Sequence, residues 1–114
     1  MNKWKVDLNS FEMGDDLVLM LTGGNKPHIG AVALAIPYKQ TSNASLLSVY
    51  GHKDGEIAKP LAEKVSKVVR KTVVVIVGIH LDNATREDIQ KFINNSNNEI
   101  DKFINDYTED WNTT

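Results

Sequence analysis

The stretch from Thr72 to Asp82 constrains the fold of this chain more than any other. It contains five consecutive β-branched residues, Val73 to Val77, whose restricted χ1 angles favour a pleated strand. Apolar and polar residues do not alternate here, which is typical of a strand buried on both faces. The sequence therefore predicts that Thr72–Gly78 is an interior strand of a sheet. Titratable residues follow it at the sheet rim, where open sheets with crossover helices usually hold ligands.

Four short strands are predicted before this one. In chain order they are Trp4–Leu8, Asp16–Thr22, Ala31–Ile36 and Leu46–Tyr50. Their connections are short, with a turn at 11–14 and a loop at 39–43, so we expect them to pair as an antiparallel meander. Alanines alternate along Ala31–Ala35, so one face of this strand carries only small side chains and is called the thin alanine face below. We expect a helix or another subunit to pack closely against that face.

Apolar residues at helical spacing predict two helices. The first is expected to begin near Lys59, because Pro60 lacks an N–H and is tolerated only in the first turn of a helix. The second is expected over Arg86–Asp110, with Thr85 as its N-cap and Asp88 as a capping-box partner. The element order β-β-β-β-α-β-α predicts an α+β fold. We expect a mainly antiparallel sheet with two helices on one face.

Length and composition indicate a soluble globular protein. The 114 residues are expected to form one domain, residues 1–114. A net charge of −2 argues against nucleic-acid binding, which needs clustered basic residues. The absence of cysteine excludes disulfides, thiolate catalysis and cysteine metal sites. No signal peptide or run of about 20 apolar residues is visible, so we expect a cytoplasmic protein without a membrane span.

A homodimer is the expected oligomeric state. The thin alanine face and the aromatic stripe of the last helix together offer more apolar surface than a small monomer should expose. The stripe itself is interpreted as core or dimer interface.

The three histidines share a sequence context. His28, His52 and His80 each follow an apolar segment and have a glycine within two residues. We expect them to converge on one pocket at the sheet rim, although each alone is compatible with a solvated loop position. Three imidazoles suit zinc, copper, iron or nickel, and Asp54 or Asp82 can orient them. Their spacing is not a known local metal motif.

The glycine-rich loop offers a second kind of chemistry. Gly23, Gly24 and Asn25 can present backbone N–H groups to an anion, with Lys26 adding positive charge. Lys53 can act in the same way near a helix entry. The P-loop and GxGxxG patterns are missing, so a single phosphate is compatible but a nucleoside triphosphate or dinucleotide is not supported. The serines lie in no nucleophile motif.

Three blocks of this sequence resemble a known family. They are Gly24–Ala33, Gly51–Asp54 and Val77–Thr85, within a match that spans roughly Leu17 to Ile89 in order and spacing. The family is the small bacterial one of LpdD-like chaperones for prenylated flavin, typified by a small component of gallate decarboxylase. It is grouped by fold with proteasome assembly chaperones. The polar segment Asn94–Asn98 departs from the resemblance.

The resemblance implies a non-enzymatic role. Such a protein would hold prenylated FMN, or FMN, after its synthesis by a flavin prenyltransferase and pass it to a prenylated-FMN-dependent decarboxylase. The histidines would face the flavin phosphate or a divalent metal that bridges to it, and His28, His52 and His80 are the candidate metal ligands. The candidate cofactor-binding residues are Gly23, Gly24, Lys26, His28, His52, Lys53, His80 and Asp82.

Two alternative functions remain open at the level of sequence. One is a small metal-dependent hydrolase or cyclase that uses the three histidines and a bound water. The other is a protein-assembly chaperone without a ligand.

Overall fold

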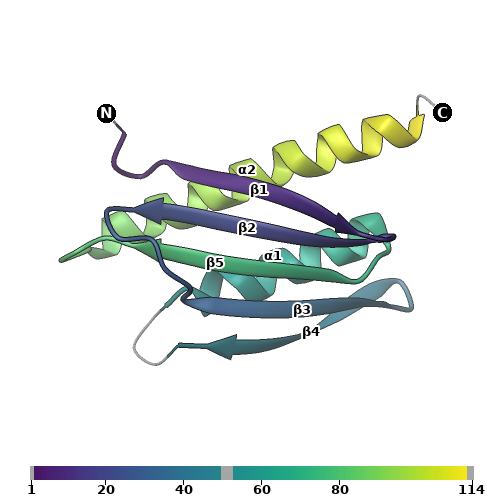
Figure 1. Cartoon of the computed structure of the whole chain (residues 1–114), viewed down its shortest axis with the longest axis horizontal. Helices are drawn as coiled ribbons and strands as arrows, with labels where there is room; N and C mark the ends of the chain where they lie inside the picture. Colours follow the sequence, from purple (N-terminus) through teal and green to yellow (C-terminus); the bar gives the residue numbers. More distant parts are fainter. Residues whose placement is uncertain (1, 50–52, 113–114) are drawn as a thin grey trace.

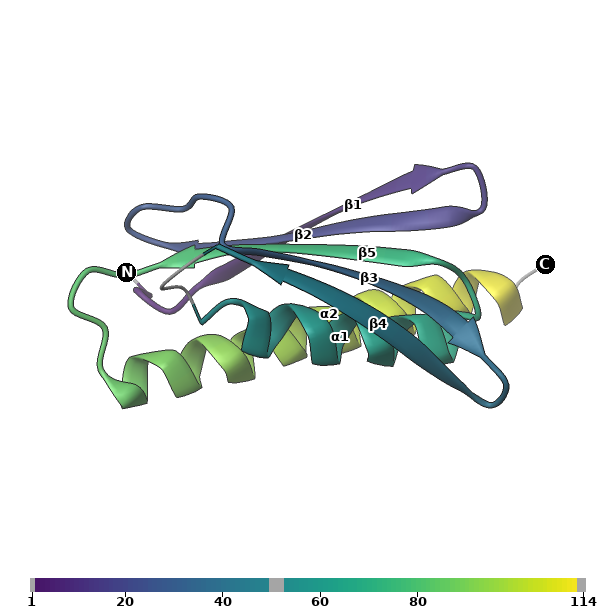
Figure 2. The ribbon, with the colours of Figure 1, turned by 90° about the horizontal axis from the view of Figure 1, so that it is seen from below.

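The computed structural model describes residues 2–49 and 53–112, and within them five strands form one sheet. The strands are β1 (Val6–Met13), β2 (Asp16–Gly24), β3 (Ala31–Tyr38), β4 (Thr41–Ser48) and β5 (Val73–His80). The helices are α1 (Gly55–Val69) and α2 (Arg86–Asn112). Both helices lie on the same face of the sheet, as Figures 1 and 2 show from two directions. The predicted α+β class and element order are confirmed.

β5 is the middle strand, as its apolar run predicts. The sheet order is β1-β2-β5-β3-β4, and β5 pairs in parallel with β2 and antiparallel with β3. Val73, Val75 and Val77 point toward the helices and are fully buried, whereas Val74 and Ile76 point to the opposite face and are half-buried. Polar residues do not alternate in this run because the side chains on both faces of β5 are apolar. The described helices cover only one of these faces.

The predicted antiparallel meander is wrong at one junction. β1–β2 and β3–β4 are antiparallel hairpins, but β2 and β3 do not pair, because β5 lies between them. Helix α1 carries the chain back along the sheet, so that β5 enters the gap between the two hairpins (Figure 1). Apolar periodicity shows which side of a strand faces the core, but it carries no information about the neighbouring strands.

Both hairpins have tighter turns than predicted. β1 continues to Met13, inside the expected turn at 11–14, and β4 already begins at Thr41, inside the expected loop at 39–43. The β3–β4 turn is only Lys39–Gln40, and Lys39 adopts a φ of 52°. β4 ends at Ser48, while the last residue of the predicted strand, Tyr50, lies outside the described residues.

Helix α1 begins earlier than the proline predicts. It starts at Gly55, and Pro60 lies in its second turn. A proline here removes the hydrogen bond to the carbonyl four residues earlier, that of Glu56. Both residues lie on the exposed side of α1, where water can satisfy that carbonyl. α2 starts at Arg86 as predicted and continues through the asparagine-rich segment to Asn112.

The thin alanine face packs against a helix. Ala31, Ala33 and Ala35 are almost completely buried beneath α1, whose Ala58 and Ala62 are fully buried as well. Of the described aromatic side chains of α2, Phe92 is only 3% exposed, and Phe103 and Tyr107 are partly buried against the same core. The thin alanine face is therefore not available to a second subunit, and the expectation that it forms a dimer contact is wrong. No described helix is long and apolar enough to cross a bilayer.

Candidate functional site at the end of the central strand

The position of β5 brings two distant segments together. Because β5 separates β2 from β3, the β2–β3 connection, residues 25–30, must cross the carboxyl end of β5. Backbone hydrogen bonds hold it there. The amides of Asn25 and Lys26 donate to the carbonyl of His80 at 2.9 and 3.3 Å, and the Gly30 amide donates to the Val77 carbonyl at 2.9 Å.

Two glycines make this close crossing possible. A Cβ atom on Gly78 would lie 2.2 Å from the carbonyl oxygen of His28. Gly24 has a φ of +85°, and a Cβ atom there would lie 1.9 Å from the carbonyl oxygen of His80. Both distances are far below van der Waals contact, so the loop lies against β5 only because these two positions lack side chains.

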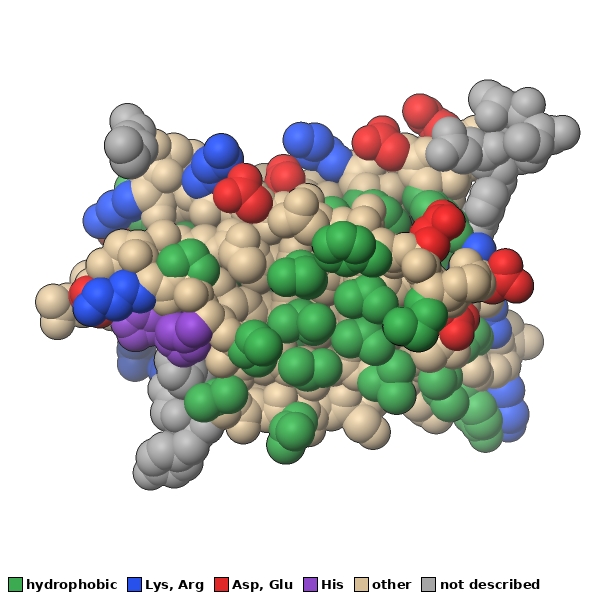
Figure 3. Space-filling model, in the orientation of Figure 1, with side chains coloured by type: hydrophobic (Ala, Val, Ile, Leu, Met, Phe, Trp, Pro, Cys, Tyr) green, Lys and Arg blue, Asp and Glu red, His purple; other side chains and the backbone are tan. Residues whose placement is uncertain are grey.

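The crossing places two of the three histidines next to each other. The rings of His28, from the loop, and His80, from the end of β5, have centroids 5.3 Å apart and planes inclined by 40°. Figure 3 shows the histidines as one group at the edge of the open face of the sheet. His52 lies outside the described residues, so the shared pocket of three histidines stays a prediction. Among the described residues, no group of three or more His, Cys, Asp or Glu side chains is arranged to hold a metal ion.

Asp82 connects the loop to the end of β5. Its carboxylate accepts hydrogen bonds from the Asn25 side-chain amide and from Lys26 Nζ, both at 3.1 Å. His80 Nε2 lies 3.0 Å from the other carboxylate oxygen. The hydrogen bond from Asn25, followed by those from His80 and Lys26, lowers the pKa of Asp82 to about 2. The carboxylate is therefore ionised at neutral pH and only accepts, so His80 carries its proton on Nε2 in this contact.

The predicted anion site at the glycine loop is wrong in one respect. The amides of Asn25 and Lys26 already donate to the His80 carbonyl, so they are not presented to an anion as a backbone nest. An anion at this end of the sheet would instead meet the side chains of Lys26, His28 and His80. Gly24 has a positive φ, and the amides of the two residues that follow it are both directed at β5.

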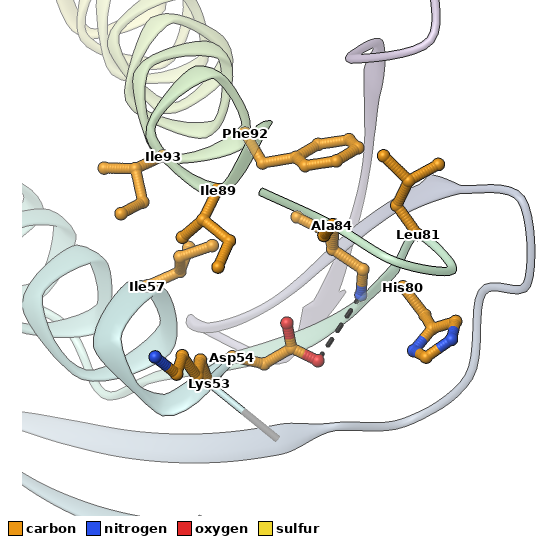
Figure 4. A pocket seen from close by; sticks show the side chains of 10 residues that line it. Lys53, Asp54, Ile57, His80, Leu81, Ala84, Ile89, Phe92 and Ile93 are labelled. Carbon is orange, nitrogen blue, oxygen red and sulfur yellow. Dashed lines mark hydrogen bonds between the residues drawn. The ribbon is translucent and has the colours of Figure 1, made fainter. Parts of the chain in front are cut away.

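A small apolar cavity lies on the helix side of the same strand end. It has a volume of about 240 Å³ and opens between the first turns of α1 and α2 (Figure 4). The polar residues at its wall are Lys53, Asp54 and His80, and in Figure 4 the His80 ring points away from the cavity. The apolar residues of the wall are Ile57, Ile79, Leu81, Ala84, Ile89, Phe92 and Ile93.

Asp54 points its side chain into the molecule at the start of α1. Its backbone carbonyl accepts the first hydrogen bonds of α1, from Ile57 and Ala58, but its side chain does not cap the helix. The carboxylate is instead directed inward, is 5% exposed, and receives the amide of Ile79 at 3.4 Å. This hydrogen bond connects the start of α1 to β5 at the cavity wall.

Sequence reasoning did not identify the apolar residues of the cavity wall. Apolar residues at helical spacing look the same whether they fill a core or line a cavity. One signal was available: Ile57, Ile89 and Phe92 all lie in the first two turns of their helices, close to the predicted sheet rim.

Comparison with known proteins agrees with the resemblance seen in the sequence. Residues 1–108 match the model of the prenylated flavin chaperone LpdD-like domain. The chain belongs to this family. It is also 29% identical over 79 residues to Protein LpdD of Lactiplantibacillus plantarum, and the matched region covers 68% of this chain and 58% of that protein. The chain thus spans a little over half of the length of this LpdD relative. The described residues at the strand end, from Gly24 to Ile93, lie within the LpdD-like domain.

Proposed function

We propose that this protein binds prenylated FMN at the end of β5 and delivers it to a prenylated-FMN-dependent decarboxylase, without itself catalysing a reaction. The observation that carries the proposal is the approach of His28 and His80, 5.3 Å apart, within a domain of the prenylated flavin chaperone family. The same family membership supports an accessory role over the alternative of a metal-dependent hydrolase.

The residues at this strand end fit the two halves of such a cofactor. Prenylated FMN joins a phosphate to a large apolar ring system. Lys26 and the two imidazoles supply donors for a phosphate, and the apolar cavity on the helix side of β5 supplies a wall for rings. Because the His80 ring points away from the cavity, the cofactor would have to pass around the end of β5 to use both. At about 240 Å³ the cavity is smaller than typical ligand pockets, which begin near ~300 Å³, so it would enclose only part of the ring system.

Asp82 opposes an anion at this site. Its carboxylate repels phosphate and already holds Lys26. The Lys26 side chain is 67% exposed, however, and an exposed ion pair of this kind is weak. Lys26 can therefore turn from Asp82 to a phosphate at little cost, and the exposed Lys53 at the cavity offers a second cation. Gly23 and Gly24 would contribute by shaping the loop.

The proposal is tested by flavin retention. The full chain and its His28→Ala, His52→Ala and His80→Ala variants are purified from cells that co-express a flavin prenyltransferase, and bound flavin absorbance per chain is measured. We expect each change to lower retention and to leave the thermal midpoint nearly unchanged. Gln40→Ala is the control, because Gln40 is exposed in the β3–β4 turn at the opposite end of the sheet. Full retention in all three histidine variants would contradict the site.

The same preparations distinguish a metal from a direct phosphate contact. A metal needs imidazoles without the extra proton, so lowering the pH would weaken binding through a metal. A bare phosphate is held more tightly by protonated imidazoles, so lowering the pH would strengthen it. Retention is therefore measured over a pH series with and without a chelator.

Delivery requires its own measurement. Flavin-loaded protein is mixed with decarboxylase that lacks its cofactor, and the recovered decarboxylase activity is compared with that produced by free prenylated FMN. Faster or more complete recovery from the loaded protein is expected. Metal-dependent turnover by the purified protein alone would instead favour the hydrolase.

We further propose that the protein works in the cytoplasm as a homodimer.

A further inference from the structure

We infer that a second copy of this chain docks on the open face of the sheet, the face that points away from α1 and α2. Figure 2 shows both helices on the opposite side, and Figure 3 shows a broad field of hydrophobic side chains across the open face. The most exposed of these side chains include Phe11 at 54%, Met13 at 73% and Leu47 at 78%.

The strand register places apolar residues side by side on this face. One row crosses four strands and consists of Phe11, Val18, Val74 and Leu34, each directly opposite the next. The adjacent row also crosses four strands and consists of Met20, Ile76, Val32 and Leu47. Neither row contains a charged residue. The centre of the open face is therefore a continuous apolar surface two residues deep along each central strand.

Polar residues on the same face lie toward its margins. On β1 these are Asp7 and Asn9, and on the other edge strand, β4, they are Asn43 and Ser45. An apolar centre without charges and a polar rim is the usual anatomy of a permanent interface, and homodimer interfaces have the more apolar centres. A surface for transient partners would carry more charged and polar groups.

The size of the face also suits a second copy. Five strands about 4.8 Å apart and about eight residues long at ~3.3 Å per residue give roughly 600 Å² per copy. Two such faces would bury about 1,200 Å², which is at the lower end of specific stable interfaces. Contiguous exposed apolar patches larger than a few hundred Å² are rare on monomers and often mark interaction sites. Two sheets stacked face to face can pack as the layers of a β-sandwich do.

Dimerisation through this face does not depend on flavin binding, although the two features are neighbours. The group formed by His28 and His80 lies at the edge of the open face in Figure 3, so a docked copy would border the proposed cofactor site. A dimer held by this face forms without flavin. Dimerisation and flavin retention can therefore fail separately.

Sedimentation equilibrium of the full chain without flavin, from low to high micromolar concentration, tests the inference. We expect the unmodified protein to have twice the mass of one chain. Leu34→Lys should weaken the dimer by at least about a hundredfold, because two-fold symmetry would bury two unpaired charges in the interface. Leu34 is 45% exposed in the single chain, so a folded monomer tolerates the lysine.

Val68→Lys is the matched control. Val68 is 43% exposed but lies on α1, away from the open face, and a lysine in the last turn of a helix is favourable. This variant should remain a dimer. Leu34→Thr, a milder change that suits a strand, should weaken the dimer less, and circular dichroism verifies that all variants are folded. A monomeric unmodified protein at high micromolar concentration would overturn the inference, as would a Leu34→Lys variant that is as dimeric as the parent.

Discussion

Two aspartates in the described structure hold segments together through hydrogen bonds to their charged form. Asp82 joins the β2–β3 loop to β5, and Asp88 joins the N-terminal segment to α2. The backbone amide of Thr85, then the indole of Trp4, lowers the pKa of Asp88 well below its usual range. Each carboxylate therefore stabilises the fold only while it is ionised.

The sign of the pH dependence follows from these lowered pKa values. The contribution of a carboxylate with a depressed pKa is fully present above its unfolded-state pKa and is lost as the pH falls toward the folded-state value. For Asp82 this range lies between pH 3.8 and about 2. We expect the thermal midpoint of the protein to fall over this range. In Asp82→Asn and Asp88→Asn the fall should be shallower, as measured by thermal unfolding at a series of acidic pH values.

A surface aspartate provides the comparison for that experiment. Asp7 contacts only the exposed Lys5 among the described ion pairs, at 3.6 Å. Asp7→Asn should leave the slope of the thermal midpoint against pH unchanged. Equal slopes in all four proteins would show that neither Asp82 nor Asp88 contributes to acid unfolding.

Gly78 is the residue on which the position of His28 depends. A methyl group at this position meets the His28 carbonyl, so Gly78→Ala should displace the loop and destabilise the fold by about 1–3 kcal/mol, as overpacking usually does. Histidine NMR resonances should shift in this variant, because the two rings separate. Thr22→Ala, which changes the position directly opposite on β2, should leave these resonances in place. Unchanged resonances in Gly78→Ala would contradict the role given to this glycine.

At the scale of elements, the start of α2 was readable from sequence in detail. Thr85 and Asp88 form the predicted capping box: the Asp88 amide donates to Thr85 Oγ1 at 3.1 Å, and the Thr85 amide donates to the Asp88 carboxylate at 3.0 Å. A local motif such as this is predictable because both partners lie within one turn. The start of α1 was not predicted correctly, because the tolerance of Pro60 depends on which side of the helix faces water.

Removal of the cap should have a measurable and local cost. We expect Thr85→Ala to lower the free energy of unfolding by about 1 kcal/mol, the usual value for the loss of a threonine N-cap. Thr108→Ala is the control in the same helix, where the hydroxyl donates only to backbone carbonyls of the preceding turn, those of Ile104 and Asn105. Alanine has the higher helix propensity, so this change should not destabilise. Urea unfolding of both variants measures the difference, and equal losses would argue against the cap.

At the scale of the whole molecule, the sequence predicted the faces of the strands better than their neighbours. The interior position of β5 followed from its unbroken apolar run, and the burial of Ala31–Ala35 followed from their small size. The insertion of β5 between β2 and β3 could not be predicted from the sequence, because side-chain periodicity does not encode strand order. The approach of His28 to His80 was expected from their positions after apolar segments, but its cause is this insertion.

The central place of β5 also has a consequence for how the chain folds during its synthesis. Among the described strands, β5 alone pairs with both hairpins, and it leaves the ribosome after all four of the other strands. Until then β2 and β3 present unsatisfied edges, which are exposed to wrong partners. Leu17 pairs with Val73, which lies far along the chain, and pairings between such distant residues slow folding. The loop that carries His28 gains its support only when β5 has paired, so a captured flavin would mark a chain in which the two hairpins are already joined.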